Sequence, residues 1–352
     1  MEEQRNIQML LDQVAQPGFC VRDGRILHSN QAARALLLEA GREIVPLLKT
    51  GSEEYARFED GQLYLTLDLG GQARNATVTR MEDMALFLLD PDPDLEEFRS
   101  MGLISMELRS PLMNVLTNAQ KLLSLLDPAS DDAAAKMNRG LLQLLRLTSN
   151  LSDVGRYREF SHMETWDICS LLEEILQKAQ ALISGNGITL SWDLPRDAIP
   201  CLLDAEQIER AVWNLISNAV KFLPQNGMIH VRLARHGKRL QLTVSDSGSG
   251  IAEQVRNTVF QRHLRQPGIE DSRFGLGLGM VIIRTVAANH GGTVLIEQNG
   301  DSGTRITMTM AIRQNTGNLL RATLFRPDYS GGWDHGLLEL SDSLPAEAYR
   351  DL

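Results

Sequence analysis

The first 92 residues contain short runs that alternate or group apolar residues in the manner of β-strands. The runs GFCVR and ILHSN flank Asp23-Gly24, a dipeptide typical of tight hairpin turns. Later strand-like runs are YLTLDLG, ARNATVTRM and MALFLLD. Between them, QAARALLLEAG is predicted to form a helix that ends at Gly41. Residues 1–92 are therefore expected to form a small α+β domain.

Residues 93–160 change to a helical pattern in which apolar or small residues recur in alternating steps of three and four. The linker PDPDLEEFRS leads into the first helix, and DPASD separates it from the second. The pattern predicts an antiparallel hairpin whose apolar stripes need a partner, so a homodimer through residues 93–160 would form a four-helix bundle. An ordinary hairpin buried inside one domain is the alternative. The seam positions are Phe98, Met101, Ser105, Leu108, Leu112, Val115, Ala119, Leu122 and Leu126, followed by Met137, Leu144, Leu147, Leu151 and Val154.

Helices and strands alternate through residues 161–313, which predicts an α/β sandwich with antiparallel strands under helices. The expected helices are LLEEILQKAQALI, AEQIERAVWNLISNAVKFL and Gly279 to His290. The expected strands are ITLSWDL, MIHVRLARH, RLQLTVSDSG, TVLIEQN and TRITMTMAI. Residues 314–352 have no assignable pattern, and disorder is the default interpretation, although Phe325, Tyr329 and Trp333 are unusually aromatic for a solvated tail.

Composition and charge narrow the functional classes. The 352 residues are 43% hydrophobic and 23% charged, as in ordinary soluble proteins. A formal net charge of −10 argues against a protein that binds nucleic-acid backbones. No apolar stretch approaches the ~20 residues of a membrane span, and the start MEEQRNIQMLLDQ lacks a signal-peptide pattern, so a cytoplasmic location is expected. Cys20, Cys169 and Cys201 have no disulfide or zinc spacing and are expected to be buried thiols.

Three polar motifs carry candidate chemistry. Asn214 and Asn218 are four residues apart on one helix face, with Lys221 nearby. Their amide oxygens could coordinate Mg²⁺, and the ammonium could neutralise phosphate, although a solvated polar face would have the same pattern. Asp246, Gly248 and Gly250 follow a strand, where a carboxylate could accept a hydrogen bond from the amine of adenine. Gly275, Gly277 and Gly279 open a helix, and backbone N–H groups there can bind phosphate.

Taken together, in this order and on these elements, the motifs resemble those of sensor histidine kinases, whose ATP-binding domain is of the GHKL type. The resemblance covers roughly residues 95–313. It implies that Asn214, Asn218 and Lys221 form the N box, Asp246, Gly248 and Gly250 the G1 box, and Gly275, Gly277 and Gly279 the G2 box. The cofactors it implies are ATP and Mg²⁺, with Asn214 and Asn218 as metal ligands. VFQRHLRQ, residues 259–266, occupies the place of the F box: Phe260 and Arg265 fit, and Arg265 would contact nucleotide, whereas His263 and Leu264 replace two aromatics.

The resemblance also implies four divisions of a multidomain α+β chain. Residues 1–92 resemble a PAS sensor domain, with another small α+β domain as the alternative. Residues 93–160 resemble the dimerisation and histidine-phosphotransfer hairpin, and residues 161–313 the ATP-binding domain. Residues 314–352 remain a tail of unknown structure.

Met106 departs from the family at the position that matters most. GLISMELRSPLMNV would be a phosphoacceptor segment if residue 106 were histidine. A neutral imidazole can attack a γ-phosphate, whereas a thioether is no comparable acceptor. Met106 could simply widen the apolar stripe of the hairpin. Asn214, standing where related ATPases carry a glutamate, also argues against efficient ATP hydrolysis, because an amide cannot act as a general base.

Three hypotheses follow. The first is a pseudokinase that binds Mg-ATP and signals by conformation. The second is a phosphatase of a response regulator, in which Glu107 and Ser110 hold the places of the acidic and water-positioning residues. The third is a kinase that phosphorylates the histidine of a different family member in a heterodimer. The expected partners are a second copy of the chain and a response regulator or another histidine kinase.

Overall fold

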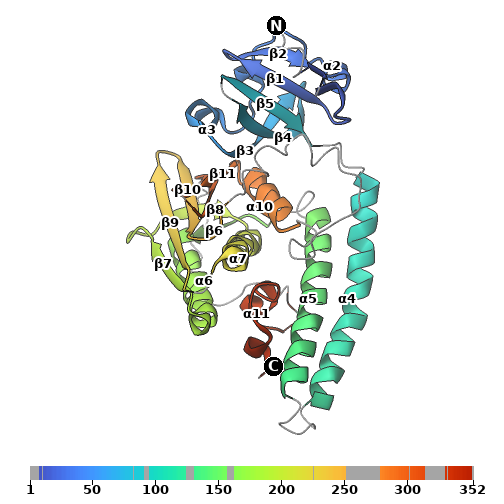
Figure 1. Ribbon diagram of the computed structural model, residues 1–352, viewed down its shortest axis with the longest axis vertical. Coiled ribbons are helices and arrows are strands. Elements are labelled where there is room, and N and C mark those ends of the chain that lie inside the picture. Colours follow the sequence, from blue (N-terminus) through green and yellow to red (C-terminus); the bar gives the residue numbers. More distant parts are fainter. Residues whose placement is uncertain are drawn as a thin grey trace.

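The computed structural model describes residues 8–9, 11–81, 83–90, 95–123, 131–156, 162–224, 226–250, 278–300, 302–313, 330 and 332–350. The N-terminal strands lie at one end of the molecule, and a long helical hairpin runs beside the α/β sheet region (Figure 1). The C-terminal elements lie between this hairpin and the helices of the sheet region.

The N-terminal part contains an antiparallel sheet, built from the five strand-like runs that the sequence shows. Its strands are β1 (Gly18–Arg22), β2 (Arg25–Ser29), β3 (Gln62–Leu69), β4 (Gln72–Met81) and β5 (Met84–Leu89), in the order β2-β1-β5-β4-β3. The short helices are α2 (Gln31–Ala35), η1 (Val45–Leu47) and α3 (Ser52–Arg57). Phe19 and Phe87 stack at 4.9 Å between ring centroids in the core of this part. Each fully buried aromatic removes a large apolar area from water, which stabilises the sheet against its helices.

The helix predicted from Gln31 to Gly41 is wrong in its length. Helix α2 ends at Ala35, and Leu37 adopts a left-handed backbone with φ of 61°. Leu38 then turns back so that its N–H donates to the carbonyl of Ala33, and its side chain is fully buried in the core. Burial of one leucine outweighs the helical propensity of the remaining residues.

The predicted hairpin is present as α4 (Leu95–Leu123) and α5 (Asp131–Arg156), which pack along each other. Only part of the predicted seam is buried within one chain. Ser105 and Ala119 are buried, together with Leu116, which the pattern did not select. Leu108, Val115 and Leu122 of α4 are instead exposed, as are Met137, Leu144 and Leu147 of α5. An apolar strip of the hairpin is therefore left uncovered by the described part of the chain.

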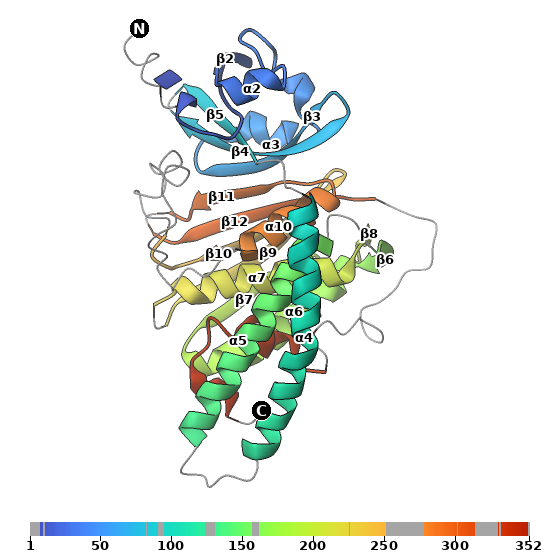
Figure 2. The ribbon, with the colours of Figure 1, turned by 90° about the vertical axis from the view of Figure 1, so that its right-hand side faces the viewer.

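The second sheet contains β7 (Thr189–Asp193), β9 (Met228–His236), β10 (Arg239–Asp246), β11 (Val294–Gln298) and β12 (Thr304–Ala311), in the order β11-β12-β10-β9-β7. Only the β7–β9 pair among these neighbours is parallel, so the predicted antiparallel arrangement holds for the others. Helices α6 (Ile168–Ile183), α7 (Ala205–Phe222) and α10 (Leu278–Asn289) cover one face (Figure 2). A small separate sheet pairs β6 (Glu164–Asp167) with β8 (Pro200–Leu203), which the sequence analysis missed.

The two larger sheets are joined edge to edge. Strand β3 pairs with β11, with Tyr64 opposite Val294, so the ten strands form one sheet. Arg284 of α10 bonds both carboxylate oxygens of Asp90 at 2.7 and 2.9 Å, and its guanidinium lies 4.1 Å from the Tyr64 ring centroid. The N-terminal part therefore contacts the α/β part directly, and does not reach it only through the hairpin.

The C-terminal segment corrects the expectation of disorder for residues 314–352. Its described residues form α11 (His335–Glu339) and the 3₁₀ turn η5 (Ala346–Tyr349). Leu338, Leu340, Leu344 and Tyr349 are buried in the same core as α6 and α7. Residues 314–329 lie outside the described part of the chain.

All three cysteines are free and buried, which confirms the sequence expectation. Burial raises the pKa of the Cys20 thiol to about 12 and that of Cys169 to about 11. These thiols are consequently protonated and inert at neutral pH.

His290 links the end of α10 to the start of α7. Its Nε2 lies 3.1 Å from the backbone N of Asp204, which caps α7, and its Nδ1 lies 2.7 Å from the carbonyl oxygen of Val286. These contacts fit a neutral ring in which Nε2 accepts and Nδ1 donates. Burial lowers the pKa of His290, against the opposing effects of the Val286 bond and the Asp204 charge.

We expect acidification to destabilise the fold through His290. Because its folded-state pKa lies below the ordinary value of about 6.5, the unfolded chain takes up more protons below that pH. The stabilising contribution of His290 is therefore present above about pH 6.5 and is lost as pH falls through the folded-state pKa. Thermal unfolding at pH 7.5 and 5.5 should show a smaller acid-induced decrease in Tm for His290→Gln than for the native chain. His236→Gln, at an exposed position at the end of β9, is the matched control, and an equal decrease in all three proteins would contradict the prediction.

Candidate functional site

Helix α7 carries the first predicted motif. Asp204 caps it by accepting a hydrogen bond from the backbone N of Gln207 at 3.1 Å, and most of its residues are buried. Asn214 is only 1% exposed, whereas Asn218 and Lys221, one and two turns further along, are partly exposed. The helix therefore brings the three motif residues to one side, as their spacing predicts.

Asn214 is held from two directions. Its Nδ2 donates to the carbonyl of Arg210 at 2.8 Å, and its Oδ1 accepts from Nη2 of Arg146 at 3.3 Å. Arg146 belongs to α5 of the hairpin, 68 positions away in the sequence. Sequence reasoning missed Arg146, because nothing in its local pattern marks it as a neighbour of α7.

Asp246 lies at the end of β10, as predicted. Its Oδ1 accepts from the backbone N of Gly248 at 2.8 Å and from that of Thr304 at 3.1 Å. Burial raises the pKa of the Asp246 carboxyl, and the two backbone bonds partly offset this effect. Because both bonds fall on one oxygen, they fix the orientation of the carboxyl group.

The described glycines of the motifs allow very close contact around α7. A Cβ on Gly248 would lie 2.7 Å from the carbonyl oxygen of Phe222, at the end of α7. A Cβ on Gly279 would lie 2.6 Å from Oδ1 of Asn214. Gly250 has a φ of 71°, which side chains other than glycine rarely adopt. The start of α10 and the loop after β10 therefore both adjoin the predicted N box.

Other predicted residues are placed less completely. Arg265, Gly275 and Gly277, with the whole of VFQRHLRQ at 259–266, lie outside the described residues. Met106 lies within α4, directly before Glu107. Glu107 and Ser110 are both exposed on this helix, which also contains Pro111.

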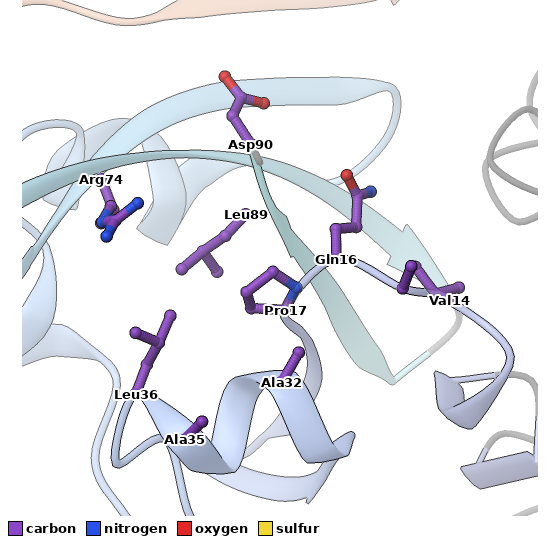
Figure 3. A pocket seen from close by; sticks show the side chains of 10 residues that line it. Val14, Gln16, Pro17, Ala32, Ala35, Leu36, Arg74, Leu89 and Asp90 are labelled. Atoms are coloured by element: carbon purple, nitrogen blue, oxygen red, sulfur yellow. The ribbon is translucent and has the colours of Figure 1, made fainter. Parts of the chain in front are cut away.

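A separate cavity lies in the N-terminal part, away from these motifs. It has a volume of about 580 Å³ and is lined between α2, the segment 14–17 and the ends of β4 and β5. Pro17, Leu36 and Leu89 form apolar walls, and Arg74 and Asp90 stand at one side (Figure 3). Asp90 is the residue that pairs with Arg284 of α10. None of the predicted nucleotide-site residues lines this cavity.

Comparison with known proteins agrees with the arrangement around α7. Residues 203–314 match the family model described as histidine kinase-, DNA gyrase B- and HSP90-like ATPase. The adaptive-response sensory kinase SasA of Synechococcus sp. (strain CC9311) is 26% identical over 255 residues, which cover 70% of this chain and 66% of that protein. These matches support a sensor histidine kinase family for this chain. Its α/β part is a GHKL-type ATPase domain.

Further relatives of this family member cover smaller shares. SasA of Synechocystis sp. (strain PCC 6803) is 28% identical over 50% of this chain and 45% of its own length. The chain thus spans between about half and two thirds of these SasA proteins. Within the described part of this chain, no helix combines the length and apolar character required to cross a bilayer.

Solved structures of histidine kinases are also similar to this chain. Full-length ShkA in complex with AMPPNP matches with a TM-score of 0.49 and 23% identity, over 62% of this chain and 47% of that one. ThkA in complex with the response regulator TrrA matches with a TM-score of 0.41 and 17% identity, over 86% of this chain and 98% of that one.

Proposed function

We propose that this histidine kinase family member binds Mg-ATP beside α7 and signals through its conformation without phosphorylating itself on the usual residue. The single observation that carries the proposal is the pairing of a nucleotide-type site with Met106 at the acceptor position of α4. Asn214, Asp246, Gly248 and Gly279 gather around α7. Glu107, which assists the acceptor histidine in the family by resemblance, directly follows a methionine.

The residues present fit an adenine nucleotide with its metal ion. The carboxyl group of Asp246 has a fixed orientation and can accept from an exocyclic amine. Gly248 and Gly279 leave no room for a side chain beside Phe222 and Asn214, so the loop after β10 and the start of α10 can lie directly against the proposed metal ligands of α7. Amide oxygens of Asn214 and Asn218 are suitable ligands for a hard cation, and Lys221 supplies a positive charge for phosphate.

The missing acceptor changes the expected chemistry. When bound, the nucleotide would offer a γ-phosphoryl group, and a neutral imidazole could accept it near neutral pH. Phosphoryl transfer to the thioether of methionine would give a sulfonium-type product that is far less stable than phosphohistidine. We therefore expect no phosphoryl transfer to Met106. Asn214 cannot act as a general base toward water, which also disfavours hydrolysis.

Two measurements test the proposal. Calorimetry with ATP and Mg²⁺ should show binding to the native chain and strongly weakened binding to Asp246→Asn, since the amide would present a donor where adenine also donates. After incubation with γ-labelled ATP, the purified chain should carry no acid-labile phosphate. Absence of binding, or label on a histidine of the native chain, would refute the proposal.

The partners follow from exposed surfaces and from relatives. The uncovered strip of Leu108, Val115, Leu122, Leu144 and Leu147 favours a homodimer in which two hairpins form a four-helix bundle. A response regulator is the proposed signalling partner, and the N-terminal part is the proposed PAS-like sensor. The proposed location is the cytoplasm.

The proposed homodimer is tested by sedimentation equilibrium, which should give twice the chain mass, and Leu108→Glu should shift the protein to the monomer.

A phosphatase activity toward a response regulator is the second candidate. Glu107 and Ser110 are exposed and three positions apart, so both reach the same side of α4. Loss of phosphate from a phosphorylated regulator should then be faster with the native chain than with Glu107→Gln. Equal decay with and without the native chain would exclude this activity.

A further inference from the structure

A buried carboxylate of the C-terminal segment joins the hairpin to the ATPase domain. Glu339 is fully buried, and its two oxygens accept from Arg146 of α5 at 3.2 Å and from Arg210 of α7. Arg210 is also fully buried and bonds Asp153 of α5 at 2.5 Å. Asp342 adds a second bond to Arg146 at 2.8 Å. Apart from Asp342, which is partly in contact with solvent, these charges are buried and compensate one another, so the segment docks as a unit.

Polar contacts extend the docked segment, Ser330–Arg350, along α5. Arg139 and Gln143 both donate to the carbonyl of Ser341, at 2.9 and 3.1 Å, and Asn138 donates to the carbonyl of Tyr349 at 3.0 Å. On the other side, Ser343 Oγ lies 2.7 Å from Ser217 Oγ, between the two asparagines of the N box. Helix α11 accordingly lies between α5 and the helices of the ATPase domain (Figure 1).

The docked segment also reaches the proposed metal ligand. Glu339 and Asp342 hold Arg146, and Nη2 of the same guanidinium donates to Oδ1 of Asn214 at 3.3 Å. An oxygen that ligates a divalent cation cannot also stand next to a guanidinium without strong repulsion between the two positive charges. Nδ2 of Asn214 is held by the carbonyl of Arg210, which disfavours rotation of the amide to free its oxygen.

We infer that the C-terminal segment Ser330–Arg350 is a built-in competitor of Mg-nucleotide binding. Docking of Glu339 and Asp342 holds the positive charge of Arg146 against Asn214, and release of the segment lets this guanidinium move away and frees the amide for the metal ion. The inference rests on the proposed function and adds to it the regulation of the same site. It gives the chain two states, one with the segment docked and one with Mg-nucleotide bound.

Thermodynamic linkage makes the inference testable from both sides. If docking of the segment weakens Mg-nucleotide binding by some factor, Mg-nucleotide must weaken docking by the same factor. The effect requires the metal ion, because the competing charge stands at the metal ligand. ATP with a chelator should therefore release the segment much less than Mg-ATP does.

The first experiment measures affinity in the full-length protein. Glu339→Gln removes the buried one of the two charges that hold Arg146, and we expect it to bind Mg-ATP about tenfold more tightly than the native chain, within the range usual for coupled sites. Glu347→Gln is the matched control, because it makes the same chemical change at an exposed position of the same segment. Gly336→Leu undocks the segment without changing a charge, since a Cβ there would already lie 2.8 Å from the Trp213 ring. It should also bind more tightly.

The second experiment follows the segment itself by hydrogen exchange. The backbone N–H groups of Leu338, Leu340 and Leu344 are hydrogen-bonded within the docked segment, and Mg-ATP should raise their exchange rates several-fold in the native chain. Unchanged affinity in both Glu339→Gln and Gly336→Leu, with Mg-ATP bound by all proteins, would overturn the inference and leave the proposed function intact. Absence of Mg-ATP binding in the native chain and in both variants would overturn both.

Discussion

Replacing Arg210 by methionine is expected to lower the free energy of unfolding by about 3–5 kcal/mol, the usual cost of removing one partner from a buried ion pair. Arg210 is fully buried and bonds Glu339 and Asp153, both of which are buried and cannot recover full hydration when the arginine is removed. Methionine fills much of the volume of the arginine stem but leaves both carboxylates without their shared cation. Denaturant unfolding monitored by circular dichroism measures the loss.

Matched variants separate the charge network from a general effect of losing an arginine. Arg235→Met, at an exposed position of β9, should change the stability by less than about 0.5 kcal/mol. The double variant Arg210→Met/Glu339→Gln should lose less than the sum of its single variants, because it removes the uncompensated carboxylate as well. Additive losses would show that Arg210 and Glu339 act independently, contrary to their direct bond.

Local patterns were sufficient to predict most of the strands and long helices. The ends of α7 and the hairpin of β9 and β10 follow from periodicity and turns within a few residues of each position, whereas α6 begins at Ile168, three residues before its predicted start. Prediction failed where a distant contact decided the outcome. Helix α2 stops early because Leu38 enters a core made by other strands. The β3–β11 pairing joins two sheet edges, and neither strand's sequence specifies which edge it will meet.

The candidate site also contains residues that local sequence reveals and residues that only a distant contact defines. Asn214, Asp246 and Gly279 were found because each belongs to a short motif with its own chemistry. Glu339 was missed because it lies in a segment without periodicity, and its partner Arg210 is 129 positions away. A lone glutamate carries no local signal that its carboxylate will be buried between two guanidiniums. Only the folded chain brings these charges together.

The direct contact between the N-terminal part and α10 gives the proposed sensor a route to the proposed nucleotide site. Asp90 lines the cavity of the N-terminal part and holds Arg284 of α10. The same helix carries Gly279 at its start, against Asn214. A change at Asp90 would therefore bear on the middle of a helix whose first turn adjoins the predicted N box, along a route separate from the hairpin.

Changing Met106 to histidine is expected to let the chain incorporate acid-labile phosphate from γ-labelled ATP, above the level of the native chain but weakly. The substitution supplies an imidazole at the family's acceptor position, next to the exposed Glu107 and on the helix that leads into the rest of the hairpin. In this phosphoryl transfer, an imidazole nitrogen forms a bond to the γ-phosphorus of ATP, the bond from that phosphorus to the bridging oxygen breaks, and ADP leaves.

Two variants decide whether such label arises by this route. Met106→Gln places a polar side chain without a nucleophile at the same position and should remain unlabelled. Met106→His/Asp246→Asn keeps the imidazole but impairs the proposed adenine contact, so its label should fall back to the native level.

If Met106→His binds Mg-ATP yet carries no label, the loss of kinase chemistry extends beyond residue 106. His263 and Leu264 in the F-box segment would then be the next positions to change, because aromatic residues stand there in the family by resemblance. A docked C-terminal segment could also limit the label, so adding Glu339→Gln to Met106→His should increase it if the segment competes with Mg-nucleotide.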